Sequence, residues 1–160
     1  MKLKKGKLLI DQHDKNGFWG GKFGGNFIPE TLKKPVEDLT ILFEKLRRDK
    51  KFIKERDYYY TNWVHKGPTP FIKLENLTKY LGGAQVWAKV VSEARGGAHK
   101  IYGAITAAML CKRMGKKFLV TDTGAGYNGK MFSIAGKHFG LKVNVFMGFK
   151  DILRQKPNCD

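Results

Sequence analysis

The sequence predicts an α/β fold built on an open parallel sheet that is incomplete within 160 residues. Strand-like apolar segments alternate with helical patterns, an order typical of right-handed β-α-β units. Only four such segments occur, and none closes an edge of the sheet: residues 71–74, 85–91, 118–120 and 141–147. Residues 151–160 have the pattern of an approach to a further helix, with Pro157 near its first turn. We therefore expect the chain to be a C-terminally truncated piece of a larger domain.

The composition is that of one globular domain, with a mass of 18.2 kDa. Hydrophobic residues at 42% and aromatic residues at 12% supply enough apolar surface for a core, which excludes wholesale disorder. No apolar run approaches the roughly 20 residues that span a bilayer, and the basic N-terminus lacks the apolar stretch of a secretory signal. We therefore expect a cytoplasmic protein that does not bind a membrane.

The formal net charge of +17 arises from 31 basic and 14 acidic residues. The lysines are spread over the whole chain, and arginine, the usual residue for bidentate phosphate and base contacts, is scarce. No specific nucleic-acid partner is expected, although weak binding of polyanions at low salt follows from the charge.

Residues 1–29 are rich in glycine and aromatic residues, which predicts an irregular, extended segment. Residues 30–160 are expected to form one partial α/β domain. Its first element is a long helix from Pro29 to about Tyr58, because apolar residues recur at helical spacing. These residues are Leu32, Val36, Leu39, Leu42, Phe43 and Leu46.

A short helix is expected between the first two strand-like segments. Asn76 is placed to cap a helix over residues 77–81, and Gly82 is placed to end it. The next helix is expected from Ala98 to about Met114, with Gly115 at its C-terminal cap. Its buried face is predicted to comprise Ile101, Ala104, Ile105, Ala108 and Met109.

The second half of the chain is expected to form a parallel pair of strands around a helix. Residues 118–120 have the pattern of a buried parallel strand. The glycine-rich loop at 123–129 leads into a helix that runs to about His138 and is ended by Gly140. The strand over residues 141–147 follows.

The first candidate for chemistry is the motif Gly97-Ala98-His99-Lys100, which places a lysine in the first turn of a helix. The positive end of the helix dipole, together with some burial, favours the free amine of such a lysine, and the free amine is a nucleophile. The alternative interpretation is a solvated lysine beside an ordinary first-turn histidine.

The second candidate is Asp122 with the loop behind it. Asp122 stands at the carboxyl end of a predicted strand, where α/β folds bind ligands, and the following amides precede a helix and can hold an anion. Gly124, Gly126 and Gly129 have the spacing of a dinucleotide-binding loop, but the acidic residue expected about 20 residues later is missing. A nucleotide-binding module therefore stays an alternative, as does a simple turn carboxylate at Asp122.

No metal site is predicted. The sequence has no His-x-x-x-His or Cys-x-x-Cys pair, and two cysteines cannot form a disulfide framework or a four-cysteine zinc site. Cys111 lies in an apolar helical stretch and is expected in the core rather than as a nucleophile.

Several short motifs occur in a fixed order along the chain. They are Phe23-Gly24-Gly25-Asn26-Phe27-Ile28-Pro29-Glu30-Thr31-Leu32, Pro68-Thr69-Pro70, Leu77-Thr78-Lys79-Tyr80-Leu81-Gly82-Gly83-Ala84, Gly97-Ala98-His99-Lys100, Lys112-Arg113-Met114-Gly115-Lys116-Lys117, Thr123-Gly124-Ala125-Gly126, Phe139-Gly140-Leu141, Met147-Gly148 and Arg154-Gln155. Together they resemble the β chains of tryptophan synthase, pyridoxal-phosphate enzymes of fold type II. The resemblance implies an incomplete three-layer open parallel sheet with flanking helices, as in the N-terminal part of that fold.

The resemblance also implies a cofactor, a reaction and roles for residues. The cofactor is pyridoxal 5′-phosphate, and the reaction replaces the hydroxyl of L-serine with indole to give L-tryptophan. Lys100 matches the lysine that bonds to the cofactor and moves protons, His99 matches its neighbour near the cofactor phosphate, and Asp122 falls where the family has a catalytic glutamate. The loop that holds the substrate carboxylate is matched by Thr123, Gly124, Ala125 and Gly126. The implied protein partners are a tryptophan synthase α chain and a second β chain in a homodimer.

The chain also departs from the family. Asp122 is one methylene shorter than glutamate, and a displacement of about 1 Å in a catalytic group can cost roughly a hundredfold in rate. Tyr127 and Asn128 replace a glutamine and a histidine. The phosphate-binding loop of the family lies downstream of these residues, so we expect this chain alone to be inactive. The alternative is a non-catalytic truncated subunit that docks an α or a β chain.

Overall fold

The computed structural model describes residues 5–6, 8–14 and 17–159. The chain divides into two compact units, Met1–Asp38 and Leu39–Asp160. The segment 1–29, for which the sequence predicts irregular structure, includes residues 1–4, 7 and 15–16, which lie outside the described part.

The glycine-rich segment of the first unit contains three short elements: η1 (Leu9–Asp11), β1 (Phe18–Trp19) and β2 (Phe23–Gly24). β1 and β2 form an antiparallel pair. Gly24 has a φ of +93°, and a Cβ atom at this position would lie 2.7 Å from the ring atom Cε3 of Trp19. Glycine is required here both by the backbone conformation and by the lack of space for a side chain.

The long helix predicted after residue 29 is in fact two helices, α1 (Glu30–Leu46) and α2 (Lys50–Tyr58). Asp49 has an extended backbone, and its carboxylate accepts a hydrogen bond from the amide of Lys51 at 2.8 Å. An aspartate in this position caps a new helix, so the prediction of one continuous helix is wrong. α2 continues directly into a π-helical turn, η2 (Tyr59–Trp63).

The strands predicted at 71–74 and 85–91 are present but shorter, as β3 (Phe71–Lys73) and β4 (Trp87–Lys89). They pair antiparallel with each other, on either side of α3 (Glu75–Leu81), and among the described residues neither pairs with any other strand. The α/β character of the fold is confirmed, but these two strands do not extend the parallel sheet. The connection through α3 returns the chain beside its own start, which makes the pair antiparallel.

The predicted caps of α3 have different outcomes. Leu74, not Asn76, occupies the N-terminal cap, and its side chain makes no capping hydrogen bond, so the prediction for Asn76 is wrong. Gly82 ends the helix in the left-handed conformation with a φ of +63°, as predicted. A short 3-10 helix, η3 (Val91–Glu93), then leads from β4 towards the next helix.

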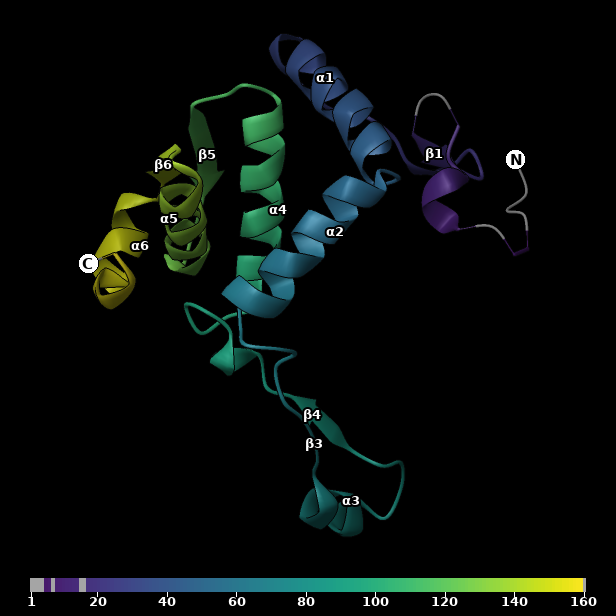
Figure 1. The fold of residues 1–160 in the computed structure, drawn as a ribbon, viewed down its shortest axis with the longest axis vertical. Helices are drawn as coiled ribbons and strands as arrows, with labels where there is room; N and C mark the ends of the chain where they lie inside the picture. Colours follow the sequence, from purple (N-terminus) through teal and green to yellow (C-terminus); the bar gives the residue numbers. More distant parts are fainter. Residues whose placement is uncertain (1–4, 7, 15–16, 160) are drawn as a thin grey trace. The chain divides into compact units, whose positions relative to one another are not determined.

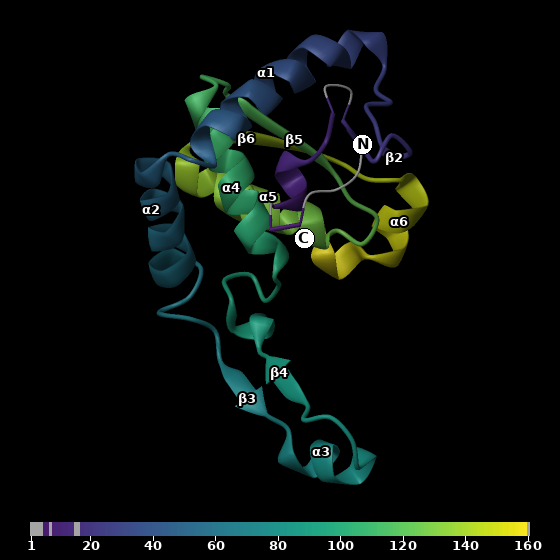
Figure 2. The ribbon, with the colours of Figure 1, turned by 90° about the vertical axis from the view of Figure 1, so that its right-hand side faces the viewer.

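The core of the second unit is built from α4 (Lys100–Arg113), β5 (Phe118–Asp122), α5 (Tyr127–Phe139) and β6 (Lys142–Phe146). β5 and β6 are parallel, in a register that pairs Phe118 with Lys142 and Asp122 with Phe146. Figure 1 and Figure 2 show α4, α5 and the two strands as one layered group. This parallel pair around a helix is the β-α-β unit that the sequence predicts.

α4 and α5 pack against each other with their N-terminal ends at the same end of the unit, because each helix runs opposite to β5. The predicted buried face of α4 is confirmed: Ile101, Ala104, Ile105, Ala108 and Met109 are all fully buried. Met131 and Ala135 of α5 are buried in the same cluster. Gly115 and Gly140 follow α4 and α5 with φ of +67° and +66°, as predicted.

Two glycines let α5 lie directly on the sheet. A Cβ atom at Gly129 would stand 2.5 Å from Cγ1 of Val145, and one at Gly136 would overlap Cγ2 of Val143. Any larger residue at either position would push α5 away from β6 and open the core.

The opposite face of the sheet is exposed. Leu119 is buried against α5, but Phe118, Val120 and Phe146 are 51%, 62% and 64% exposed. The prediction that residues 118–120 are buried is therefore wrong for Phe118 and Val120, because no other described element of the second unit covers this face. Apolar residues on both faces are nevertheless typical of a strand in a parallel sheet.

The C-terminal part forms two short helices where one was expected near Pro157. They are α6 (Phe149–Arg154) and the 3-10 helix η4 (Lys156–Asn158), with Pro157 inside η4. No helix in the described part of the chain is long and apolar enough to cross a membrane.

Candidate functional site

The site is centred on the carboxyl end of β5. Asp122 is the last residue of the strand and is exposed, and the amide of Thr123 donates to the carbonyl oxygen of Phe146 at 3.0 Å. The chain then leaves the sheet and enters α5 at Tyr127. Residues 123–126 thus form the predicted loop between a strand end and a helix N-terminus, but the loop is shorter than the predicted 123–129 because α5 already begins at Tyr127.

The two loop glycines have different surroundings. Gly126 is buried with a φ of +81°, and a Cβ atom there would lie 2.7 Å from Cβ of Asn158. Gly124 is exposed, and a Cβ atom there would meet no heavy atom within 4 Å. The loop is therefore closely packed at Gly126 and open at Gly124.

Two asparagine side chains donate hydrogen bonds to backbone carbonyl groups at the end of β5 and in the loop that follows it. Asn128 Nδ2 donates to Oγ1 of Thr121 at 2.8 Å and to the carbonyl oxygen of Asp122 at 3.2 Å. Asn158 Nδ2 donates to the carbonyl oxygen of Ala125 at 2.8 Å. Two carbonyl groups of the turn are thus occupied by hydrogen bonds from neighbouring side chains.

The amides of the same loop are available. Over the ranges that the structure describes, the amides of Gly124, Ala125 and Gly126 donate no hydrogen bond to protein atoms. The first amides of α5 also lack acceptors within the helix, as in any helix N-terminus. Free amides beside the positive end of a helix dipole favour the binding of an anionic group.

Lys100 is the first residue of α4, and His99 precedes it at the N-terminal cap without a side-chain capping bond. Both side chains are exposed. The loop before them turns through Gly96 and Gly97, whose φ angles are +80° and +77°. A Cβ atom at Gly96 would overlap the side chain of Met131, so this loop packs closely on α5.

One hydrogen bond joins the two candidate segments. The hydroxyl of Tyr127, at the start of α5, donates to the carbonyl oxygen of Gly96 at 3.1 Å. A Cβ atom at Gly97 would lie 3.0 Å from the same hydroxyl oxygen. The structure therefore brings the start of the Lys100 helix and the Thr123–Gly126 loop to the same end of the sheet.

The sequence identifies the candidate reactive residues but not the side chains that form hydrogen bonds with the backbone around them. Tyr127 and Asn128 stood out only as departures from a family pattern, and Asn158 did not stand out at all. A weak signal was present, because a tyrosine and an asparagine directly after a glycine loop can reach nearby backbone groups.

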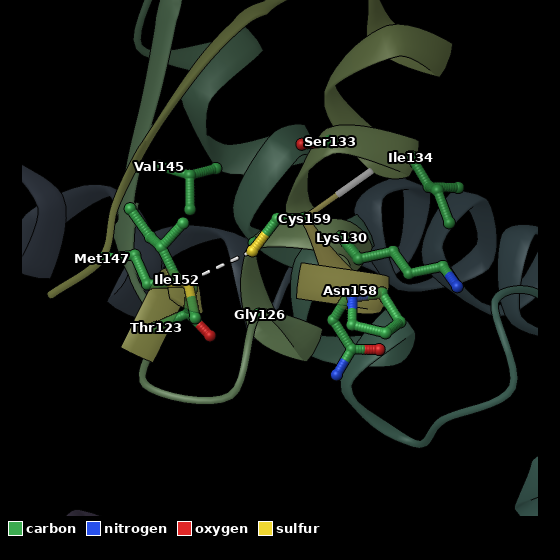
Figure 3. A pocket seen from close by; sticks show the side chains of 12 residues that line it. Thr123, Gly126, Lys130, Ser133, Ile134, Val145, Met147, Ile152, Asn158 and Cys159 are labelled. Atoms are coloured by element: carbon green, nitrogen blue, oxygen red, sulfur yellow. Dashed lines mark hydrogen bonds between the residues drawn. The ribbon is translucent and has the colours of Figure 1, made fainter. Parts of the chain in front are cut away.

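A cavity of about 450 Å³ lies behind the loop, between α5, β6 and the C-terminal helices (Figure 3). Its lining includes Thr123, Gly126, Gly129, Lys130, Ser133, Ile134, Val145, Met147, Ile152, Pro157, Asn158 and Cys159. In Figure 3, Cys159 lies near the centre of this view, with its sulfur 3.6 Å from that of Met147. Lys100, His99 and Asp122 are not part of the lining, so this cavity adjoins the candidate site without containing the residues that the sequence predicts to be reactive.

Within the second unit, two titratable side chains have pKa values shifted by burial. Burial raises the pKa of the Cys111 thiol, which supports the prediction that it belongs to the core and is not a nucleophile. Burial among aromatic rings, together with Arg95, lowers the pKa of His138. In the described ranges no group of three histidine, cysteine or carboxylate side chains is placed to hold a metal ion.

Comparison with known proteins identifies relatives over most of the chain. The protein family described as "Pyridoxal-phosphate dependent enzyme" matches residues 63–152. Two curated proteins named "Tryptophan synthase beta chain" come from Leptospira biflexa serovar Patoc, one from strain Patoc 1 / Ames and one from strain Patoc 1 / ATCC 23582 / Paris. Each is 42% identical over 139 residues, which is 87% of this chain and 35% of the relative. The chain thus spans about a third of the length of these relatives.

Proposed function

Because this chain belongs to the family of pyridoxal-phosphate dependent enzymes, we propose that it carries the lysine and the substrate-carboxylate loop of a tryptophan synthase β-type active site. The reaction proposed for the complete site is the replacement of the hydroxyl of L-serine by indole. The observation that carries the proposal is the hydrogen bond between Tyr127 and Gly96, because it holds the two predicted segments together.

The side chains and amides of the site fit this cofactor. An exposed primary amine stands at the start of α4, and amides without acceptors stand at the start of α5. An amine can bond to an aldehyde, and free amides at a helix N-terminus can bind a carboxylate or a phosphate. These are the groups that a pyridoxal phosphate and an amino-acid substrate present.

The proposed roles divide between the two segments. Lys100 Nζ would hold the cofactor through its aldehyde group, with loss of water, and would hold and move a proton once the amine of the substrate had displaced it. His99 lies next to it, at the cap of α4, and is proposed to contact the cofactor phosphate. When bound, the cofactor supplies an electron sink for negative charge that develops on the substrate.

The loop orients the substrate. The amides of Gly124, Ala125 and Gly126 are proposed to bind the carboxylate of L-serine, which fixes its α-carbon relative to the start of α4. The resemblance also assigns the amide of Thr123 to this role, but that amide already donates to the carbonyl oxygen of Phe146. Asp122 leads into the loop and is proposed to act on a proton near indole, in the place of the glutamate implied by the resemblance. Its carbonyl group is held by Asn128, while its carboxylate remains exposed.

The test is covalent capture of the cofactor at one lysine. The full chain is mixed with pyridoxal phosphate, the visible absorbance band is recorded, and the bond is fixed by borohydride reduction and located by peptide mass spectrometry. The expected result is modification at Lys100 and loss of the band in Lys100→Ala. Lys112→Ala is the matched control, because Lys112 is an exposed lysine in the last turn of the same helix. Equal modification of the wild type and Lys100→Ala would overturn the proposal.

A second candidate function is docking to a complete α or β chain without catalysis. The observation that favours it is the exposed apolar face of β5 and β6, which is suited to burial against another polypeptide. Co-purification with an intact tryptophan synthase, combined with no cofactor bond at Lys100, would select this function over the first.

A further inference from the structure

Tyr127 is the residue of the site that links two segments distant in sequence. It is the first residue of α5 and is half-buried, and its hydroxyl reaches across to the carbonyl oxygen of Gly96. Over residues 17–159, no other protein group donates to that carbonyl oxygen. The side chain of Tyr127 therefore makes the polar contact between the start of α5 and the loop that leads into α4.

The loop that receives this bond has little structure of its own. Gly96 and Gly97 both have left-handed φ angles, and the amide of Gly97 donates to the carbonyl oxygen of Ala94 at 2.7 Å. Glycines in succession leave a backbone with much conformational freedom in the absence of external contacts. Lys100 lies three residues after Gly97, so the position of its amine depends on the conformation of this loop.

Two packing contacts hold the side chain of Tyr127 beside the Gly96–Gly97 turn. On one side, the hydroxyl oxygen lies so close to Gly97 that a Cβ atom on Gly97 would be only 3.0 Å from it. On the other side, Lys130 Nζ lies 5.5 Å from the centroid of the Tyr127 ring, a distance typical of a cation–π contact. The ring is thus held between the next turn of its own helix and the glycine loop.

We propose that Tyr127 is a positioning residue that fixes the start of the Lys100 helix relative to the carboxylate-binding loop, so that the amine and the loop amides face one ligand at a fixed separation. This inference rests on the proposed function. Tyr127 itself is not expected to touch the reacting atoms. Its effect is to keep the Gly96–Gly97 turn in one conformation before any ligand binds, so that the ligand does not have to order the loop.

The experiment compares Tyr127→Phe with the wild-type chain. Tyr127→Phe removes only the hydroxyl and keeps the ring. Tyr80→Phe is the matched control, because Tyr80 is 86% exposed and its hydroxyl has no hydrogen-bond partner among the described residues. Hydrogen–deuterium exchange of the unliganded chains is followed by mass spectrometry, and the affinity for pyridoxal phosphate is measured from the absorbance titration.

In Tyr127→Phe we expect faster exchange at residues 96–100, unchanged exchange in the centre of α4, and roughly two- to tenfold weaker cofactor binding, the loss typical of one hydrogen bond. Tyr80→Phe should match the wild type in all three measurements. Unchanged exchange at residues 96–100 would overturn the proposed positioning role, even if the cofactor binds. Faster exchange throughout α4 would also overturn it, because it would show a general structural role.

Different results would refute the proposed function and the positioning role of Tyr127. A wild-type chain without a cofactor bond at Lys100 would refute the proposed function, and the exchange data would still show whether Tyr127 holds the loop. A wild-type chain with that bond and a Tyr127→Phe chain of equal affinity would refute the positioning role alone.

Discussion

Asn158 Nδ2 and the carbonyl oxygen of Ala125 lie 2.8 Å apart, so a residue near the C-terminal end of the described chain holds the loop that follows β5. The same side chain packs against Gly126, where a Cβ atom would lie 2.7 Å from Cβ of Asn158. The η4 turn is therefore part of the candidate site through both a polar and a steric contact.

The first prediction concerns this contact. Asn158→Ala leaves the carbonyl of Ala125 without its protein donor and should lower the free energy of unfolding by about 1 kcal/mol. Urea unfolding measures the change. Asn76→Ala is the control, because Asn76 makes no capping bond, and it should change stability little. Equal losses in the two variants would show that the Asn158 contact has no special effect.

The second prediction tests the turn before α4. Gly96→Ala should destabilise the chain by about 2–4 kcal/mol, since its left-handed backbone disfavours a side chain and the new methyl group would overlap Met131. Gly103→Ala, in an open position within α4, should instead stabilise it by about 0.5–1 kcal/mol. If the turn is packed as described, thermal unfolding should show a lower Tm for Gly96→Ala and a higher Tm for Gly103→Ala than for the wild type.

The third prediction separates the two thiols. Cys159 is exposed, whereas Cys111 is buried and its pKa is raised by burial. A thiol reagent at neutral pH should therefore modify Cys159 quickly and Cys111 only on unfolding. Mass spectrometry of the labelled chain, with Cys159→Ser as the control, measures both rates. Rapid labelling of Cys159→Ser would contradict the described core.

The fourth prediction concerns pH. The ring of His138 packs against Trp63, with ring centroids 4.6 Å apart, and burial and Arg95 lower the pKa of His138. The folded chain then binds fewer protons at this site than the unfolded chain, so stability should fall as the pH drops from about 7 to 5. His138→Phe should flatten this dependence in urea unfolding, whereas His13→Phe should leave it unchanged.

The fifth prediction addresses the uncovered face of the sheet. Val120→Lys should reduce the fluorescence of a hydrophobic dye bound to the chain and change stability little, because Val120 is 62% exposed. Leu119→Lys, one residue earlier but buried against α5, should unfold the chain. Similar behaviour of the two variants would mean that the two faces of β5 do not differ as described.

Local sequence signals predicted much of the second unit. The buried face of α4, the glycines that end α3, α4 and α5, and the loop between β5 and α5 all depend on residues close together in sequence. Such features are set by helical periodicity and by backbone conformations that favour glycine. The position of Lys100 in the first turn of its helix was predictable for the same reason.

Features that depend on distant contacts were not predictable. The break at Asp49 lies inside a charged stretch where apolar spacing gives no guidance, and the direction of β4 relative to β3 depends on how the chain packs through α3. The contact between Tyr127 and Gly96 joins residues 31 positions apart and exists only because α4 packs on α5. No local pattern contains that information.

The parallel arrangement of α4 and α5 has an electrostatic consequence. Each helix carries about half a positive charge at its beginning, and both beginnings lie at one end of the same small sheet. Neighbouring helices that run in opposite directions offset each other's fields, whereas these two reinforce one another. Without a bound anion, the partial positive charges at the beginnings of α4 and α5 repel each other. A bound dianion offsets this repulsion. Ligand capture at this end should therefore weaken steeply as ionic strength rises.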